Sequence, residues 1–192
     1  MPLLDIFLLR PQACIHACEN RRAPLWISVF IIVIGVAYGI LVALLQRSFG
    51  GELQGIPVAG IPLWVLTLGN ILPGILIVIM VHIGIMLVAW LMAKAVGGPG
   101  LLALLYRSAG YLLPLLLPAL PAIAFTVATT TTTAHSAGSL PWLYLALAVV
   151  SAALFLAGLY QMFRVTQNFP STRALFATAL FAAFSVSILS LA

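Results

Sequence analysis

The sequence has very few acidic residues. Asp5, Glu19 and Glu52 are the three carboxylates among 192 residues, and no other follows Glu52. Acid–base catalysis, divalent metal binding and proton relays draw mainly on such side chains. The chain also lacks an HExxH or CxxC motif, a phosphate-binding loop with its lysine, and a serine with a base at hand. We therefore expect a protein that is not an enzyme, with no catalytic residue, no metal site and no cofactor.

Charge of either sign is scarce. Charged residues make up 6% of the chain and hydrophobic residues 64%, where globular proteins have about 25% charged residues. The net charge is +5, but the eight basic residues stand singly or in one pair between apolar runs. The absence of a basic patch excludes nucleic acid as a partner. A chain this apolar has lipid as its solvent, which predicts an integral membrane protein.

Five apolar segments reach the length of about 20 residues that a helix needs to cross a bilayer. Proline, glycine or basic residues separate them. We expect an all-α fold, an integral membrane bundle of five transmembrane helices in a single domain over 1–192, with spans at about 25–45, 70–93, 101–125, 141–162 and 175–191.

Two connecting segments have a distinct composition. Residues 48–68 are rich in glycine and proline but also apolar, so they are too broken to span and too apolar to leave the membrane. We expect this segment to lie along the interface or to fold back onto the bundle. The threonine run Thr129–Thr133 predicts a solvated hairpin without function.

The basic residues predict the orientation. If the N-terminus is cytoplasmic, one face of the membrane receives seven of the eight and the other receives only Arg47. This asymmetry follows the positive-inside rule and places the C-terminus outside the cytoplasm. The first apolar stretch is short, is interrupted by Asp5 and lacks a cleavage pattern, so we expect no cleaved signal peptide.

Residues 1–22 predict a cytoplasmic interfacial arm. Pro11 suits the first turn of a helix, on which Cys14, Ile15 and Cys18 would form an apolar stripe. A disulfide between the cysteines is not expected in a reducing compartment. With His16 they supply three ligands, one short of a structural zinc site. Acylation of the two cysteines is left open by the sequence.

Two ionisable residues in or near the spans are candidates for function. His82 lies well inside the second span, where such a side chain is a functional candidate by default. The alternative is a neutral imidazole bonded to a backbone carbonyl, to Asn70, to Thr67 or to a tyrosine. Arg107 would either reach lipid phosphate at the interface or cap a cavity in the bundle.

The third span carries the most unusual backbone. Pro114, Pro118 and Pro121 each remove an amide hydrogen, which predicts a kink or break near the middle of the membrane. A broken helix can line a cavity, and a small transporter or channel is therefore the alternative function. The paired repeat and the midplane charge of many transporters are both missing from the sequence.

Glycines favour helix–helix contact in the first span. Gly35 and Gly39 form a small-xxx-small pair that permits close approach of another helix. The candidate interface or cavity residues are Gly35, Gly39, His82, Gly97, Gly98, Arg107, Tyr111, Pro114 and Pro118.

Several short motifs stand out along the chain: Leu9-Arg10-Pro11-Gln12, Glu19-Asn20-Arg21 with Trp26, Gly97-Gly98-Pro99-Gly100, Leu104, Tyr106-Arg107, and Gly110-Tyr111 with Pro114. In these motifs the chain resembles the bacterial branch of the Ypt-interacting-protein (Yip) family of five-span membrane proteins, and the likeness covers nearly the whole chain.

This resemblance implies a non-enzymatic helical protein of the bacterial inner membrane with a cytoplasmic N-terminus. Eukaryotic relatives are associated with Rab-type GTPases through a long N-terminal region, but an arm of 22 residues is too short for such docking. The expectation is a partner subunit, assembly factor or membrane-organising factor that acts through helix–helix association. Its partners would be membrane lipid and a second copy or a larger membrane complex.

Overall fold

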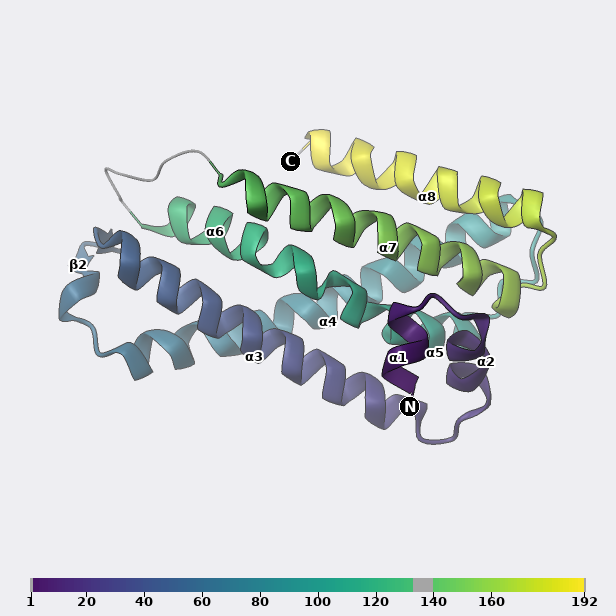
Figure 1. Cartoon of the computed structure of the whole chain (residues 1–192), viewed down its shortest axis with the longest axis horizontal. Coiled ribbons are helices and arrows are strands. Elements are labelled where there is room, and N and C mark those ends of the chain that lie inside the picture. Colours follow the sequence, from purple (N-terminus) through teal and green to yellow (C-terminus); the bar gives the residue numbers. More distant parts are fainter. Residues whose placement is uncertain (1, 133–139, 192) are drawn as a thin grey trace. The chain divides into compact units, whose positions relative to one another are not determined.

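The computed structural model describes residues 2–132 and 140–191, with side chains over 5–132 and 140–187. Helices dominate this part of the chain, which confirms the all-α class (Figure 1). The elements are α1 (Pro2–Phe7), α2 (Pro11–Glu19), α3 (Ala23–Phe49), β1 (Glu52–Leu53), β2 (Ile56–Pro57), η1 (Val58–Gly60), α4 (Leu63–Ala95), α5 (Leu102–Leu112), η2 (Leu113–Ala119), α6 (Leu120–Thr131), α7 (Trp142–Thr166) and α8 (Ser171–Leu191), where η denotes a 3-10 helix.

Four helical segments are long and apolar enough to cross a membrane. They are α3, α4, the run Leu102–Thr131 and α7. The protein is therefore an integral membrane protein built from helices, and these four segments overlap the first four expected spans. The C-terminal helix α8 is also apolar but shorter over its described part, Ser171–Ser187, so a fifth span stays a prediction.

Helix α4 begins earlier than expected. It starts at Leu63, whereas the sequence predicted a connecting segment up to residue 68. The carbonyl of Pro62 accepts the amides of Val65 and Leu66, at 3.0 and 3.1 Å, and so opens the helix before the uninterrupted apolar run. The 33 residues of α4 extend about 50 Å at 1.5 Å per residue, more than a hydrocarbon core of about 30 Å. We therefore expect α4 to tilt or to emerge from the core.

The segment after α3 folds back onto the protein. Strands β1 and β2 pair antiparallel, and the turn residues Gln54 and Gly55 have φ of 53° and 81°, as a two-residue type I′ turn requires. Val58 is fully buried in a cluster with Ala43 and Leu66. Of the two expected placements of residues 48–68, the structure shows the one in which the segment folds back onto the protein.

Helix α6 continues into the threonine run. The predicted hairpin is wrong for Thr129–Thr131, which are helical. The hydroxyls of Thr130, Thr131 and Thr132 donate to carbonyls one turn back, at 3.0, 2.7 and 2.7 Å. These bonds satisfy the hydroxyls without solvent, so the helix can run on. Thr133 lies outside the described residues.

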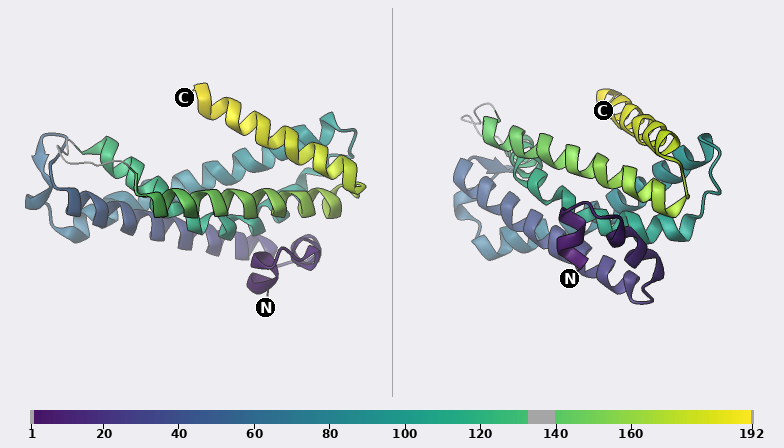
Figure 2. Two further views of the ribbon diagram at one scale, coloured as in Figure 1. Left: turned by 45° about the horizontal axis from the view of Figure 1, so that its top comes forward. Right: turned by 45° about the vertical axis from the view of Figure 1, so that its right-hand side comes forward.

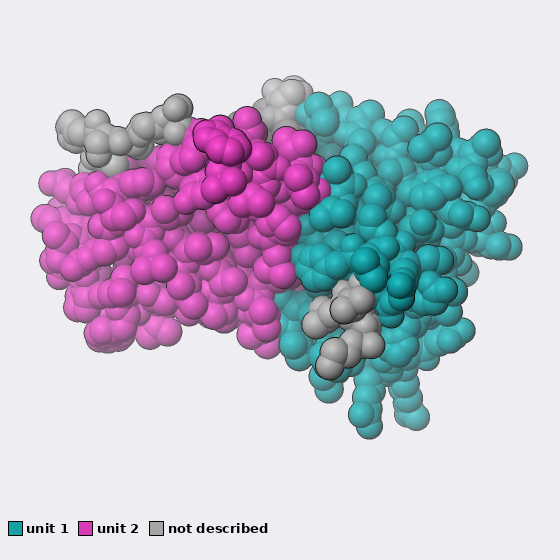
Figure 3. Space-filling model, viewed as in Figure 1, with its two compact units in different colours: residues 1–30, 80–115, 153–192 teal, residues 31–79, 116–152 magenta. Residues whose placement is uncertain are grey.

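The chain divides into two compact units, coloured separately in Figure 3. Unit 1 comprises residues 1–30, 80–115 and 153–192, and unit 2 comprises residues 31–79 and 116–152. In unit 1, α8 follows the turn after α7 and returns beside it (Figure 2).

Close backbone approach holds α3 to α4 in unit 2. A Cβ atom added to Gly39 would lie 2.6 Å from the Cα of Ile71, and one added to Gly35 would lie 2.7 Å from the Cα of Ile75. Such distances leave room for hydrogen alone. The small-residue pair is therefore used within the chain, where it brings two helices into backbone contact.

A methyl group at this contact should destabilise the protein. We expect Gly39→Ala to lower the free energy of unfolding by about 1–3 kcal/mol, because the backbone of α4 must move away. Gly84→Ala, on α4, is the matched control, since a Cβ there meets nothing within 4 Å. The measurement is unfolding of the purified protein in mixed detergent micelles. Equal unfolding curves for the two variants would contradict the contact.

Candidate functional site

The N-terminal arm docks on the third span. Helix α2 packs against α5, and both belong to unit 1. The buried face of α2 is formed by Ala13, Cys14 and Ala17, whereas Ile15 is 41% exposed. The expected apolar stripe is therefore wrong in including Ile15, because the face that packs is set by α5. Ile15 therefore lies on the exposed side of α2.

Arg107 links α5 to this arm. Its Nη1 donates to the carbonyl oxygen of Cys18 at 3.0 Å. The sequence predicted contact with lipid phosphate or a cavity cap, and the structure shows a third role. A guanidinium bonded to a backbone carbonyl at the end of α2 fixes where the arm lies.

Tyr111 is the packing centre beneath the arm. It is 1% exposed, and its ring meets His16 edge-on at 6.4 Å and Phe30 at 5.8 Å between centroids. Edge contacts of this kind contribute about 0.5–1.5 kcal/mol beyond area burial. The adjoining cavity, lined also by Cys14 and Gly158, has about 10 Å³, room for roughly one water.

Gly97 and Gly98 end α4 in a Schellman motif. Gly97 has φ of +80°; its amide bonds to the Lys94 carbonyl at 3.0 Å, and the Gly98 amide bonds to the Ala93 carbonyl at 2.8 Å. A Cβ at Gly98 would lie 2.5 Å from the ring of Phe169. The two glycines therefore make a turn that is closely covered by the loop before α8.

The Gly97–Gly100 turn is held by a side chain that the sequence analysis missed, that of Gln167. The Oε1 of Gln167, which is 3% exposed, accepts the amide of Gly100 at 2.8 Å. Lys94 Nζ donates to the Pro99 carbonyl at 3.0 Å. In the sequence, Gln167 is a polar residue at the end of the fourth span. Its partner, Gly100, lies 67 residues away in the chain, so no local pattern connects the two. The contacts of this turn therefore indicate a structural role within unit 1.

His82 is buried on α4 without a hydrogen bond to any described residue. It is 2% exposed, and neither ring nitrogen has a partner within the described chain. The expected partners are engaged elsewhere: Asn70 bonds to Gln46 and Leu66, and Thr67 bonds to Leu63. The ring of Tyr106 contacts the imidazole edge-on at 4.8 Å. Packing therefore holds His82 in place.

The predicted break in the third span is confirmed. The 3-10 segment η2 separates α5 from α6 and contains Pro118. Pro114 is buried there, and Pro121 lies in the first turn of α6. A cavity that joins Pro114, Pro118, His82 and Arg107 stays a prediction.

Unit 2 contains a second polar cluster that the sequence analysis missed. Asn70 Nδ2 donates to Gln46 Oε1 at 3.0 Å, and Gln46 Nε2 donates to Thr131 Oγ1 at 2.9 Å. Three spans thus meet through one hydrogen-bonded chain. The signal in the sequence was one polar residue near the same end of each of three spans, and only topology brings them together.

Within the described residues, no group of three or more His, Cys, Asp or Glu side chains is placed to hold a metal ion.

No family model, curated protein or solved structure matches the chain.

The two cysteines of the arm differ in environment. Both are free thiols. Burial, with a smaller contribution from Cys18, raises the pKa of Cys14 from 9.0 to about 12. Burial also raises the pKa of Cys18, where Arg107 acts in the opposite direction. A raised thiol pKa favours the folded state below the ordinary value of 9.0, and this stabilisation is lost as pH rises from there toward 12.

The thiols should therefore react in a fixed order. We expect maleimide to modify Cys18 at least about tenfold faster than Cys14 near neutral pH, because reaction needs both thiolate and access. Cys14→Ser and Cys18→Ser each leave one thiol, and mass spectrometry gives the two rates. Equal rates in the folded protein would contradict the docked arm.

Proposed function

We propose that the protein is a non-enzymatic membrane subunit of the Yip type, which associates through its helices with a second copy of itself or with a larger membrane complex. One observation carries this proposal. A groove of about 420 Å³ lies along α7 and α8 in unit 1, lined by Leu156, Ala157, Tyr160, Leu175, Thr178, Ala179 and Ala182.

The floor of this groove suits a helix. Ala157, Thr178, Ala179 and Ala182 are small, and small residues let another backbone approach closely. Thr178 and Ala182 are one turn apart and so share a face of α8. The Thr178 hydroxyl donates to the Ala174 carbonyl at 2.8 Å, so the groove presents an apolar surface. In lipid, such shape complementarity drives helix association.

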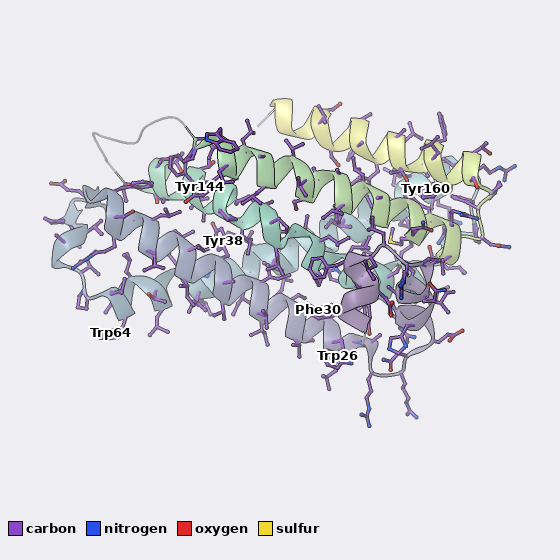
Figure 4. All side chains as sticks on the ribbon, viewed as in Figure 1. Trp26, Phe30, Tyr38, Trp64, Tyr144 and Tyr160 are labelled. Carbon is purple, nitrogen blue, oxygen red and sulfur yellow. The ribbon has the colours of Figure 1, made fainter. Side chains whose placement is uncertain are left out.

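An aromatic side chain lies at the groove. Tyr160, labelled in Figure 4, is a lining residue, and the guanidinium of Arg164 lies 5.9 Å from its ring centroid. Arg164 follows it by one turn near the end of α7. An arginine and a tyrosine at the end of a span are typical of the membrane interface. This pair would therefore set the depth in the membrane at which a partner helix meets the groove.

The Yip assignment is supported by where its residues lie. The arm, the Gly97–Gly100 turn, Arg107, Tyr111 and Pro114 all belong to unit 1. Arg107 bonds the arm, and Tyr111 packs beneath it. The residues that carry the resemblance therefore include groups that depend on one another in the fold.

The proposed location is the bacterial inner membrane, with α8 as a fifth span. Its 21 residues extend about 31 Å, enough to cross the hydrocarbon core. The seven basic residues then lie on the cytoplasmic side with the N-terminus. A membrane-impermeant maleimide should accordingly reach Cys18 in inverted vesicles and not in intact cells; labelling in intact cells would overturn this orientation.

Filling the groove should weaken association. We expect Ala182→Leu to weaken self-association or complex formation by about tenfold or more, as measured by crosslinking and native mass analysis in mild detergent. Ala183→Leu is the matched control, because Ala183 is the next residue on α8 and is exposed outside the groove. A strictly monomeric wild-type particle with no co-purifying protein would remove the basis of the proposal.

A small carrier or channel is the second candidate, and the 3-10 break at η2 is the observation that favours it. In this case His82→Leu and Pro114→Ala should change the flux of protons, potassium or glycerol in liposomes several-fold. Flux that stays at the level of protein-free liposomes in the wild type and in both variants would reject this candidate.

A further inference from the structure

Unit 2 has a cavity of about 310 Å³ with one polar wall. Gln46 of α3, Asn70 of α4 and Thr131 of α6 form that wall, while Leu53 and Val65 contribute to the apolar side. Trp64, labelled in Figure 4, is 68% exposed at the start of α4, and tryptophan is enriched at the membrane interface. We therefore expect the cavity at the depth of lipid headgroups.

The direction of every hydrogen bond in the polar wall is fixed. Asn70 Nδ2 donates to the Leu66 carbonyl at 2.8 Å and to Gln46 Oε1 at 3.0 Å. Gln46 Nε2 donates to Thr131 Oγ1 at 2.9 Å, and Thr131 Oγ1 donates to the Val127 carbonyl at 2.7 Å. Because the carbonyls at both ends only accept, neither amide can be reversed.

One acceptor and one donor are left over. Both N–H groups of Asn70 are used, and no described residue bonds to Asn70 Oδ1. Gln46 Nε2 has a second N–H beyond the one given to Thr131. An alcohol hydroxyl donates one hydrogen bond and accepts others, so it is the simplest group that satisfies both atoms.

The cavity favours a neutral ligand. No charged side chain is among the described residues that line it. The nearby cation, Arg47, has its Nη1 bonded to the carbonyls of Val58, Ala59 and Ile61 at 2.8, 3.0 and 3.1 Å. Arg47 is not among the described residues that line the cavity, so within that lining a phosphate would find no basic side chain and a cation would find no carboxylate.

Size and surroundings indicate a headgroup with a hydrocarbon tail. At about 30 Å³ per water, the volume matches a glycerol-sized group with its first carbons. Val65 borders the cavity and is 39% exposed, and Leu68 and Leu72 on the same helix are 60% and 68% exposed. A tail leaving past Val65 would lie along this apolar surface in lipid.

We propose that this cavity binds the hydroxyl headgroup of a neutral lipid alcohol, with diacylglycerol and polyprenol as the two sources of that chemistry. The hydroxyl donates to Asn70 Oδ1 and accepts from Gln46 Nε2. This site is independent of the α7–α8 groove, so either proposal can fail alone.

The test uses the full chain in lipid nanodiscs with photoreactive diacylglycerol, photoreactive polyprenol and photoreactive phosphatidylcholine. Gly69→Leu is the blocking variant, because Gly69 lines the cavity and a Cβ there meets nothing within 4 Å. Gly84→Leu on the same helix is the control, since its Cβ position is equally open. Asn70→Leu removes the acceptor, and thermal unfolding shows whether each variant folds.

We expect an alcohol probe to label residues 61–70 saturably, with competition by the unlabelled alcohol. Gly69→Leu and Asn70→Leu should reduce this labelling about tenfold, and Gly84→Leu should not. Labelling by only one alcohol identifies the source. Equal labelling by phosphatidylcholine, no saturable labelling by either alcohol, or unchanged labelling in a folded Gly69→Leu variant would overturn the proposal.

Discussion

The structure depends on satisfying polar groups without water. Lipid offers no hydrogen-bond partner, so a polar group in a span is stabilised by a hydrogen bond inside the chain. Within the described residues His82 is an exception, which packing against Tyr106 holds in place. The threonine hydroxyls of α6 bond to carbonyls one turn back, which lets the helix run to Thr131. Arg47 bonds to the carbonyls after β2 and Arg107 to the carbonyl of Cys18. The same requirement thus extends a helix, returns the hairpin segment to the protein and docks the N-terminal arm.

Close approach of the helices depends on glycine at several contacts. In lipid the hydrophobic effect does not drive helices together, and close approach has to supply dispersion contacts instead. Gly39 meets the backbone of Ile71, and Gly110 lies against the side chain of Ile27. The α7–α8 groove has the same chemistry, with Ala157 and Ala182 in its lining, but within the described chain no helix fills it. For this reason we propose association at this groove rather than at Gly35 and Gly39.

Composition and the proline positions predicted those features of the fold that depend on one segment of sequence alone. The first four spans follow from apolar length, and the break at η2 follows from Pro114 and Pro118. The predicted start of α4 was wrong, because the Pro62 carbonyl accepts the first helical amides and the helix begins before the uninterrupted apolar run. Periodicity could not decide which face of α2 meets α5, so Ile15 was misplaced. Gln46 and Asn70, 24 residues apart, meet only through the pairing of two helices, and no local pattern encodes that contact.

Many charged side chains of the described chain bond to other parts of the fold. This limits the kinds of ligand that the protein can recognise. Arg47, Lys94 and Arg107 each donate to backbone carbonyls, and Arg164 lies over the ring of Tyr160. No acidic residue lies within the four long apolar helical segments. An ion crossing these spans would therefore meet few groups able to replace its hydration, and burying it unpaired would be costly. A neutral ligand needs only an amide or carbonyl at the right depth, which Gln46 and Asn70 provide. The scarcity of charge thus favours recognition of uncharged groups, whether a helix or a lipid alcohol.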